Sequence, residues 1–410
     1  MIKDKQYFKF CFYGFLKNLR FFDAFFILFL VDKGLSYTEI GILYATREIF
    51  INLFEIPSGI IADTYGRKNA LIGSFLAYIL SFYIFYISSD FWLFMAAFIF
   101  YGIGDSFRTG THKGMIMDYL KLKNRENQKI SYYGRTRSWS QKGSAVSALV
   151  AGFIVFSNGS YQNIFLYSII PYIINLLLIL SYPKELNRSG NRKEGVGMVQ
   201  TLKTLVKIIK QPSVLKIINT SALHTAYLQA VKDYIQPLLI NISLTIPILL
   251  NVEPEKKNGI IVGVIYFFIF LATSRASQLA AKVAAKNKSK ISYITLLYGF
   301  IFGIVCGIFY VNNLWVVALI AFVGIYIIEN IRKPILTGFI SDNVPNKILA
   351  SVISAQSILR TILTAALAFS FGVIADIYGI GISFVVISVV LTLLTLILNS
   401  YSNKNRQPAQ

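Results

Sequence analysis

Residues 59–68 read GIIADTYGRK, and they lie between two apolar segments that are each long enough to cross a membrane. The stretch places a carboxylate, Asp63, a few residues before a basic pair, Arg67 and Lys68, with a glycine at position 59 and another at position 66. In a water-soluble protein it would be a tight turn with two solvated cations. Its place between two candidate membrane helices favours a short functional loop in a membrane protein.

The composition supports a chain that crosses the membrane many times. Of the 410 residues, 55% are hydrophobic and only 14% are charged, and the mean hydropathy is +0.59. A soluble protein of this size could not hide so much apolar surface. We therefore expect an all-α integral membrane protein with twelve transmembrane helices, at residues 8–31, 37–61, 69–88, 91–118, 139–157, 162–181, 213–240, 259–281, 291–310, 315–341, 348–374 and 379–399.

The net charge of +21 indicates topology rather than a nucleic-acid partner. If the N-terminus is cytoplasmic, only Lys33, Lys256 and Lys257 among the basic residues outside the spans fall on the opposite side. Such asymmetry is what the positive-inside rule expects. We therefore predict a multi-pass protein of the plasma membrane with both termini in the cytoplasm, in contact with the lipid bilayer and not with nucleic acid.

Several kinds of chemistry find no support in the sequence. Cys11 and Cys306 both lie in candidate helices, so no disulfide framework is expected. Two histidines and no clustered thiols predict no metal site, and we expect no cofactor. The sequence has no Gly-x-x-x-x-Gly-Lys-[Ser/Thr] loop for binding the phosphates of ATP, so we expect an ion gradient to supply the energy. The sequence also shows no nucleophile–base pair, so we do not expect an enzyme.

The chain divides into two halves joined by a basic linker. We predict a six-helix bundle at residues 1–182, a cytoplasmic linker at 183–212 and a second six-helix bundle at 213–410. Within the linker, residues 198–210 alternate apolar and basic positions at helical spacing, which predicts an amphipathic helix at the membrane surface.

The halves share a spaced pattern that indicates an internal duplication. Asp105 and Arg108 are followed by a glycine, an isoleucine and Asp118, and the same spacing recurs 224 residues later from Glu329 and Arg332 to Asp342. A further string, GVIADIYG at residues 372–379, mimics the first loop without its basic pair. Its place after the eleventh span puts it outside the membrane, and we interpret it as a helix end and turn rather than a second gate.

The loop, the twelve spans, the basic linker and the repeat together resemble the major facilitator superfamily of secondary transporters. The resemblance implies two halves that move around a site near the membrane midplane. It also implies a cytoplasmic gate in the outward-facing state, which by position would consist of Gly59, Asp63, Gly66, Arg67, Lys68 and Asp118. Thr64 departs from the family pattern, in which a basic residue is common at that position.

Ionisable residues near the middle of the spans are the candidate substrate and proton site. Charges at the bilayer centre are costly unless they face a partner or a water-filled cavity. The candidates are Arg20, Asp23, Arg47, Glu48, Asp105, Arg108, Glu329, Arg332 and Arg360. Three of the acid–arginine pairs are three residues apart and can neutralise themselves on one helix face, and a purely structural role stays open for each of them.

The arginines outnumber the acids in this set, which favours an anionic or zwitterionic cargo. We predict a monomeric secondary transporter for a small organic solute that works by alternating access and is coupled to protons, with Asp105 or Glu48 as the proton carrier. The alternatives are a multidrug–proton efflux antiporter and, in another class, a transport-inactive sensor or scaffold. Arg108 keeps the arginine of the drug-antiporter pattern in the fourth helix and little else of it.

Overall fold

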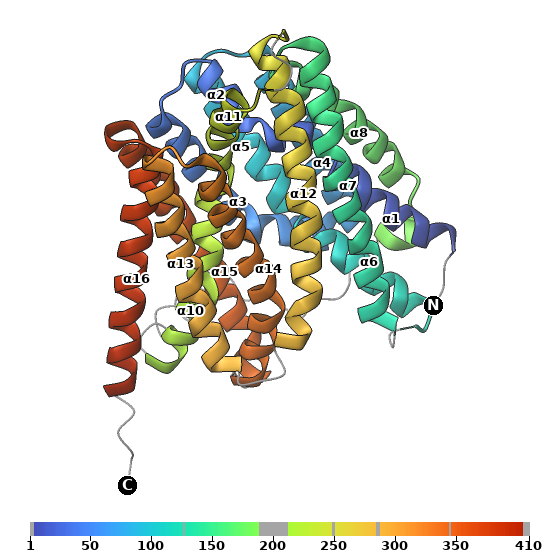
Figure 1. Cartoon of the computed structure of the whole chain (residues 1–410). Helices are drawn as coiled ribbons and strands as arrows, with labels where there is room; N and C mark the ends of the chain where they lie inside the picture. Colours follow the sequence, from blue (N-terminus) through green and yellow to red (C-terminus); the bar gives the residue numbers. More distant parts are fainter. Residues whose placement is uncertain are drawn as a thin grey trace. The chain divides into compact units, whose positions relative to one another are not determined.

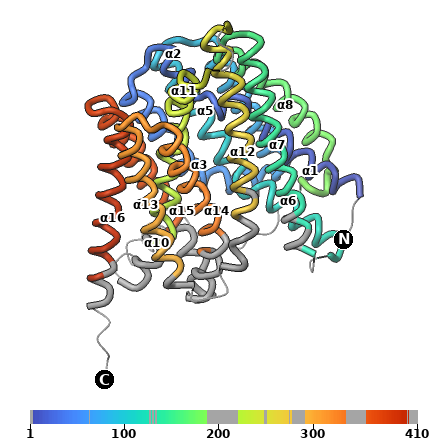
Figure 2. Tube along the Cα trace, viewed as in Figure 1, coloured from blue at the N-terminus to red at the C-terminus, as the bar shows by residue number. Residues whose placement is uncertain are grey.

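The computed structural model describes residues 4–125, 128–187, 212–247, 251–283, 288–343 and 346–404 (Figure 2). These residues form α-helices, short 3-10 helices and turns, and no strand occurs among them. The expectation of an all-helical protein is therefore confirmed for this part of the chain. The amphipathic helix expected at residues 198–210 lies outside the described residues.

The chain forms two compact units. The first unit comprises residues 1–35, 46–195 and 246–270, and the second comprises residues 36–45, 196–245 and 271–410. Helices α3 (Tyr37–Tyr65) and α12 (Pro254–Val283) each contribute one end to each unit. The predicted division at residues 183 and 212 stays a prediction.

The first unit contains the helices of the N-terminal part of the chain (Figure 1). In chain order they are α1 (Lys5–Lys17), η1 (Phe21–Ala24), α2 (Phe26–Asp32), α4 (Arg67–Ile87), α5 (Phe91–Arg108), α6 (Thr111–Leu122), α7 (Lys129–Asn158), α8 (Asn163–Leu180) and η3 (Lys184–Asn187). Helix α4 packs against α5 and α8, and α1 packs against α7 and α8.

The second unit contains α10 (Pro212–Val231), η4 (Lys232–Tyr234), α11 (Ile235–Thr245), α13 (Lys288–Val311), α14 (Trp315–Asn343), α15 (Asn346–Tyr378) and α16 (Ile380–Lys404). Helix α13 packs against both α14 and α16, and α10 packs against α15. Figure 1 shows α13 and α16 running side by side.

Seven helical segments among the described residues are long and apolar enough to cross a membrane. They are Arg67–Ile87, Asn163–Leu180, Pro254–Thr273, Ile291–Val311, Trp315–Lys333, Gln356–Tyr378 and Ile380–Leu398. These helices make the chain a membrane protein, whereas the count of twelve spans stays an expectation.

Three of the expected spans are interrupted rather than continuous. The first span breaks between α1 and η1, the fourth between α5 and α6, and the seventh at η4. In the fourth, Thr109 is extended and Gly110 has a φ of 83°, a conformation that glycine adopts without steric cost. Each break lies beside charged residues, and the first two lie at members of the candidate site.

Aromatic rings form much of the core of the first unit. Phe26 stacks on Phe98 at 5.2 Å between ring centroids, and Phe22 stacks on Phe165 at the same distance. Serine hydroxyls join the helices where the backbones come close, as when Ser74 donates to the carbonyl oxygen of Gly104 at 2.7 Å. This core fixes α4 and α5, which carry the central residues of the site.

Candidate functional site

The break after α1 positions Arg20 and Asp23. Asn18 caps the end of α1, and the chain then turns into η1. Nη2 of Arg20 lies 2.9 Å from Oδ2 of Asp23, so the expected ion pair across three residues is confirmed. Nη1 of Arg20 also donates to the hydroxyl of Tyr101 on α5, which ties the break to the neighbouring helix.

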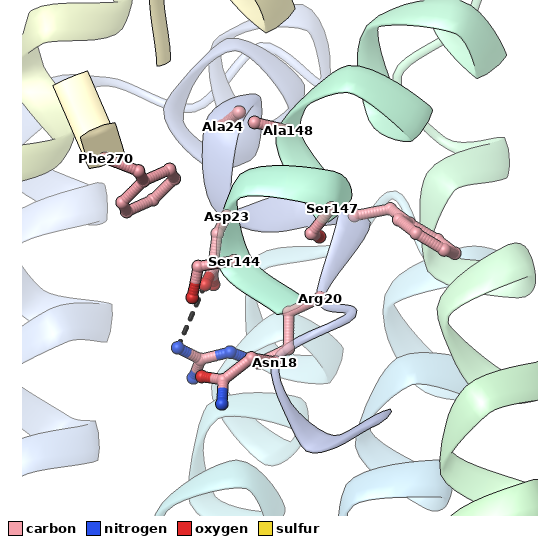
Figure 3. Close-up of a pocket in the computed structure, with 9 residues that line it drawn as sticks. Asn18, Arg20, Asp23, Ala24, Ser144, Ser147, Ala148 and Phe270 are labelled. Atoms are coloured by element: carbon pink, nitrogen blue, oxygen red, sulfur yellow. Dashed lines mark ion pairs between the residues drawn. The ribbon is translucent and has the colours of Figure 1, made fainter. Parts of the chain in front are cut away.

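A small cavity opens beside this pair (Figure 3). It is lined by Asn18, Arg20, Phe21, Asp23, Ala24, Ser144, Ser147, Ala148 and Phe270. Its volume is ≈ 10 Å³, which is about the space that one water molecule needs. This cavity is therefore too small to hold an organic solute in the state described.

The end of α5 places Asp105 and Arg108 against Tyr78 of α4. Nη2 of Arg108 lies 2.5 Å from Oδ1 of Asp105, which confirms the second expected pair. The Tyr78 hydroxyl donates to the same carboxylate oxygen at 2.5 Å and accepts from Nε of Arg108 at 2.9 Å. A buried tyrosine thus bridges the acid and the base, and no spacing in the sequence indicates it.

Lys17 adds a basic side chain that the sequence prediction did not include. The charges that act on Lys17 belong to Arg108, Arg20, Arg137 and Asp105. Asp105 is already paired with Arg108, and no acid among the described residues lies within ion-pair distance of Lys17. Basic side chains therefore outnumber acidic ones around the ends of α1 and α5.

His112 lies close to Lys17. On a continuous helix it would share one face with Asp105 and Arg108, seven and four residues earlier. Because α5 ends at Arg108, His112 belongs to α6 and the assumed helical spacing does not hold. Its ring stacks on Tyr13 of α1 with 3.6 Å between centroids, and Nε2 lies 3.5 Å from the Tyr182 hydroxyl.

Arg47 and Glu48 form the third charged pair of the first unit. Nη2 of Arg47 lies 2.9 Å from Oε1 of Glu48, and the carboxylate is buried. The guanidinium carbon of Arg47 lies 6.0 Å from the ring centroid of Tyr101, whose hydroxyl also accepts a hydrogen bond from Arg20. Tyr101 therefore joins the two arginine pairs.

In the second unit the expected pairing of Glu329 with Arg332 is wrong. Oε2 of Glu329 lies 2.7 Å from Nδ1 of His224 on α10, and Thr225 donates to Oε1 at 2.7 Å. Arg332 instead donates to the carbonyl oxygens of Ser292 and Thr220 and to the Thr295 hydroxyl. Residues on neighbouring helices pair with both groups, and helical spacing alone could not reveal these partners.

Two further charged groups of the second unit have polar partners. The carboxylate of Asp233 accepts from the Tyr44 hydroxyl at 2.9 Å and lies 3.7 Å from Nζ of Lys232. Arg360 donates to the Ser357 hydroxyl at 3.3 Å, and its Nε is buried without a hydrogen-bond partner. Asp233 and Arg360 thus add polar character to the faces of η4 and α15.

The loop at residues 59–68 brings together most of the expected gate. Arg67 lies 2.5 Å from Oδ2 of Asp118, and the backbone N–H of Lys68 donates to the side chain of Asn187 at 3.0 Å. Gly66 has a φ of 96°, and a Cβ there would lie 2.3 Å from the backbone oxygen of Asn187, so only glycine fits.

The remaining two gate positions are less defined. A Cβ at Gly59 would meet no described atom within 4 Å, so no close approach of another helix occurs there among the described residues. The side chain of Asp63 lies outside what the structure describes. The gate role of these six residues stays a prediction.

A metal site has no candidate within the described ranges, where no group of three or more His, Cys, Asp or Glu side chains could hold an ion. The arrangement instead supplies paired charges, tyrosine hydroxyls and interrupted helices. Such features bind and release polar solutes inside a membrane bundle.

Comparisons with known proteins show which family the chain belongs to. A model of the family described as the Major Facilitator Superfamily matches residues 12–367. The uncharacterised MFS-type transporter YxaM of Bacillus subtilis (strain 168) is 24% identical over 385 residues, which cover 90% of this chain and 89% of YxaM.

Solved structures share the fold at low identity. A mutant of the nucleoside transporter NupG has a TM-score of 0.79 at 13% identity, covering 96% of this chain and 99% of its own. A POT family transporter in complex with 5-aminolevulinic acid has a TM-score of 0.71 at 14% identity, and the match covers 98% of this chain and 97% of that transporter. A D-xylose-proton symporter has a TM-score of 0.69 at 14% identity, and the match covers 96% of this chain and 95% of the symporter. Because the family model spans most of the chain, the protein belongs to the major facilitator superfamily and is a membrane transporter rather than an enzyme.

Proposed function

We propose that this transporter moves a small organic solute with an anionic or zwitterionic group, by alternating access and with proton coupling. Its place is the plasma membrane, its termini are cytoplasmic and it works as a monomer. The observation that carries the proposal is the excess of basic over acidic side chains in the first unit. There each acid of the candidate site is already paired with an arginine, and Lys17 is left with no acid of its own among the described residues.

Charge balance explains why this excess favours an anion. A cation held away from bulk water is costly unless an opposite charge reaches it. Guanidinium groups bind carboxylate or phosphate oxygens with two parallel hydrogen bonds. A solute carboxylate placed between Lys17 and Arg108 would neutralise the surplus while Asp105 remains on Tyr78.

The structural neighbours include transporters of uncharged and of zwitterionic solutes, so they do not select the class of cargo. One is titled a D-xylose-proton symporter, and another holds 5-aminolevulinic acid, a zwitterion. At 14% identity they show that this fold accommodates proton coupling and zwitterionic cargo. The proposal for this chain rests on its own charges.

Mass spectrometry of proteoliposomes tests the proposal. Purified protein in liposomes is incubated with cell extract, with and without an imposed pH gradient, and the lumenal solutes are compared. We expect an anionic or zwitterionic solute to accumulate only with the wild type and the gradient. The Arg108→Ala variant should lose this accumulation, and the matched variant Arg125→Ala, at an exposed position beyond α6, should retain it.

Two results would contradict the proposal. Accumulation of a cationic, amphiphilic solute would favour the multidrug antiporter. A correctly inserted protein that moves no solute under either condition would favour the sensor or scaffold.

A further inference from the structure

The pair formed by His224 and Glu329 is the most deeply buried ionisable pair that the structure describes in the second unit. The side chains are 0% and 1% exposed, and they join α10 to α14. Nδ1 of His224 lies 2.7 Å from Oε2 of Glu329, and the Thr225 hydroxyl donates a hydrogen bond to Oε1. Both carboxylate oxygens are thus held by donors, which requires Nδ1 to carry a hydrogen when the carboxylate is ionised.

The opposite nitrogen of the histidine ring has no such partner. Nε2 of His224 is buried without a hydrogen bond. It faces Gly299 of α13, where an added Cβ would lie within 1.9 Å of it. With Nδ1–H directed at Glu329, Nε2 carries a free lone pair, so a proton can be added there without breaking the bond between the two side chains.

The charges around the pair are few and of one sign. From α14, Arg332 and Lys333 act on His224 together with Glu329. Arg332 is 0% exposed and bound to carbonyl and hydroxyl oxygens, and Nζ of Lys333 lies 4.0 Å from Oε1 of Glu329 with its side chain 53% exposed.

The other helices packed against α10 bring mainly uncharged groups to the ring. From α13, the ring of Phe300 lies 5.9 Å from that of His224. On α10 itself Tyr227 lies 6.2 Å away and is bonded to Ser388 of α16. On α15, the Thr364 hydroxyl donates a hydrogen bond to the side chain of Gln229 on α10. The charged residue one helical turn before Thr364 is Arg360.

We propose that His224 and Glu329 together form the site that takes up the coupling proton, at Nε2 of His224. This inference rests on the proposed proton coupling and assigns it to residues other than Asp105 and Glu48. Proton uptake converts a neutral imidazole beside a carboxylate into an imidazolium–carboxylate pair, and release restores the neutral ring. No other bond forms or breaks.

The partners of the acids decide between these candidates. Asp105 and Glu48 each contact an arginine, which stays charged at every physiological pH. Glu329 contacts a histidine, whose charge changes in the physiological range. Among these three acids, Glu329 is therefore the one whose partner can change its own charge. Arg332 remains bound to backbone oxygens nearby.

Nitrogen-15 NMR of histidine-labelled full-length protein in nanodiscs tests the site without any substrate. The chain has two histidines, so the spectrum is simple and each signal is assigned by its loss in His224→Gln or His112→Gln. We expect the His224 signals to change from a neutral ring with hydrogen on Nδ1 to an imidazolium between about pH 8 and 5. In Glu329→Gln, which has lost the carboxylate, the change should move to lower pH or disappear.

A His224 signal that stays neutral or stays charged across this range would overturn the proposal and leave a purely structural pair. Transport then tests coupling separately. His224→Gln and Glu329→Gln should retain exchange of the identified solute across the membrane but lose accumulation driven by the pH gradient. Full gradient-driven accumulation in both variants would also overturn it, whereas absence of any transport in the wild type would reject the proposed function and not the protonation site seen by NMR.

Discussion

The carboxylate of Asp376 accepts hydrogen bonds from the backbone N–H groups of Tyr37 at 2.8 Å and Thr38 at 2.7 Å. A side chain near the end of α15 thereby caps the first turn of α3, whose N–H groups have no partner within their own helix. The backbones also come close, because a Cβ at Gly372 would lie 2.2 Å from the carbonyl oxygen of Tyr37.

This contact gives the string at residues 372–379 a second role. Helix α15 ends at Tyr378 and Gly379 follows with a φ of 88°, so the expected helix end and turn are confirmed. The same residues also hold the start of α3, which the sequence did not indicate. The glycine and the acid of this string, four residues apart, repeat the spacing of Gly59 and Asp63 in the first loop.

Replacing Asp376 with asparagine should weaken this cap. The variant loses the negative charge that favours the helix N-terminus but keeps one oxygen acceptor, and we expect a loss of about 0.3–1 kcal/mol in the free energy of unfolding, near the lower limit because Asp376 is exposed. Thermal unfolding of the detergent-solubilised protein measures it. Asp32→Asn, an exposed acid at the end of α2, should leave the midpoint unchanged. Equal midpoints for both variants would show that the cap contributes nothing.

Glycine at position 372 should resist substitution by alanine. The added methyl group would meet the backbone of Tyr37, so α3 and α15 must move apart at a cost of about 1–3 kcal/mol. Gly73→Ala in α4 is the matched control, since a Cβ there meets no described atom within 4 Å. A Gly372→Ala protein as stable as Gly73→Ala would contradict the close approach.

The hydroxyl of Tyr78 should stabilise the first unit through Asp105 and Arg108. Tyr78→Phe keeps the ring but removes both hydrogen bonds from a buried position, which we expect to cost about 1–3 kcal/mol. Tyr83→Phe on the exposed face of the same helix is the control. Unchanged thermal stability of Tyr78→Phe relative to Tyr83→Phe would refute the bridging role.

The ion pair between Arg67 and Asp118 should matter more for transport than for folding. Both side chains are partly exposed, so the coupling energy in a double-mutant cycle should not exceed about 1 kcal/mol. As parts of the proposed gate, Arg67→Asp and Asp118→Arg should each slow transport, and the double variant should recover part of the rate. Recovery of stability without recovery of rate would argue for a structural pair only.

The sequence predicted the membrane fold and part of the site because those features are local or periodic. Apolar runs of membrane length and the loop at 59–68 indicate the family, and spacing of three residues correctly predicts the pairs of Arg20 with Asp23 and of Asp105 with Arg108. The same reasoning failed for Glu329 and Arg332.

The failures share a physical cause, which is contact between residues far apart in the chain. His224 lies 105 residues from Glu329 in sequence, and Tyr78 lies 27 residues from Asp105. The helix breaks were missed because apolar residues resume on both sides of each short polar stretch, and only backbone angles, such as that of Gly110, reveal the interruption. Pairing across helices follows from packing, and no period in the sequence encodes it.

The most direct test of the account measures the pH inside proteoliposomes loaded with a fluorescent pH indicator, with no gradient imposed. Cell extract is separated by charge into anionic, zwitterionic and cationic fractions, and each is added outside. We expect that an anionic or zwitterionic fraction changes the internal pH with the wild type and that His224→Gln abolishes the change. A response confined to the cationic fraction, or an unchanged internal pH with every fraction for a correctly inserted protein, would contradict it.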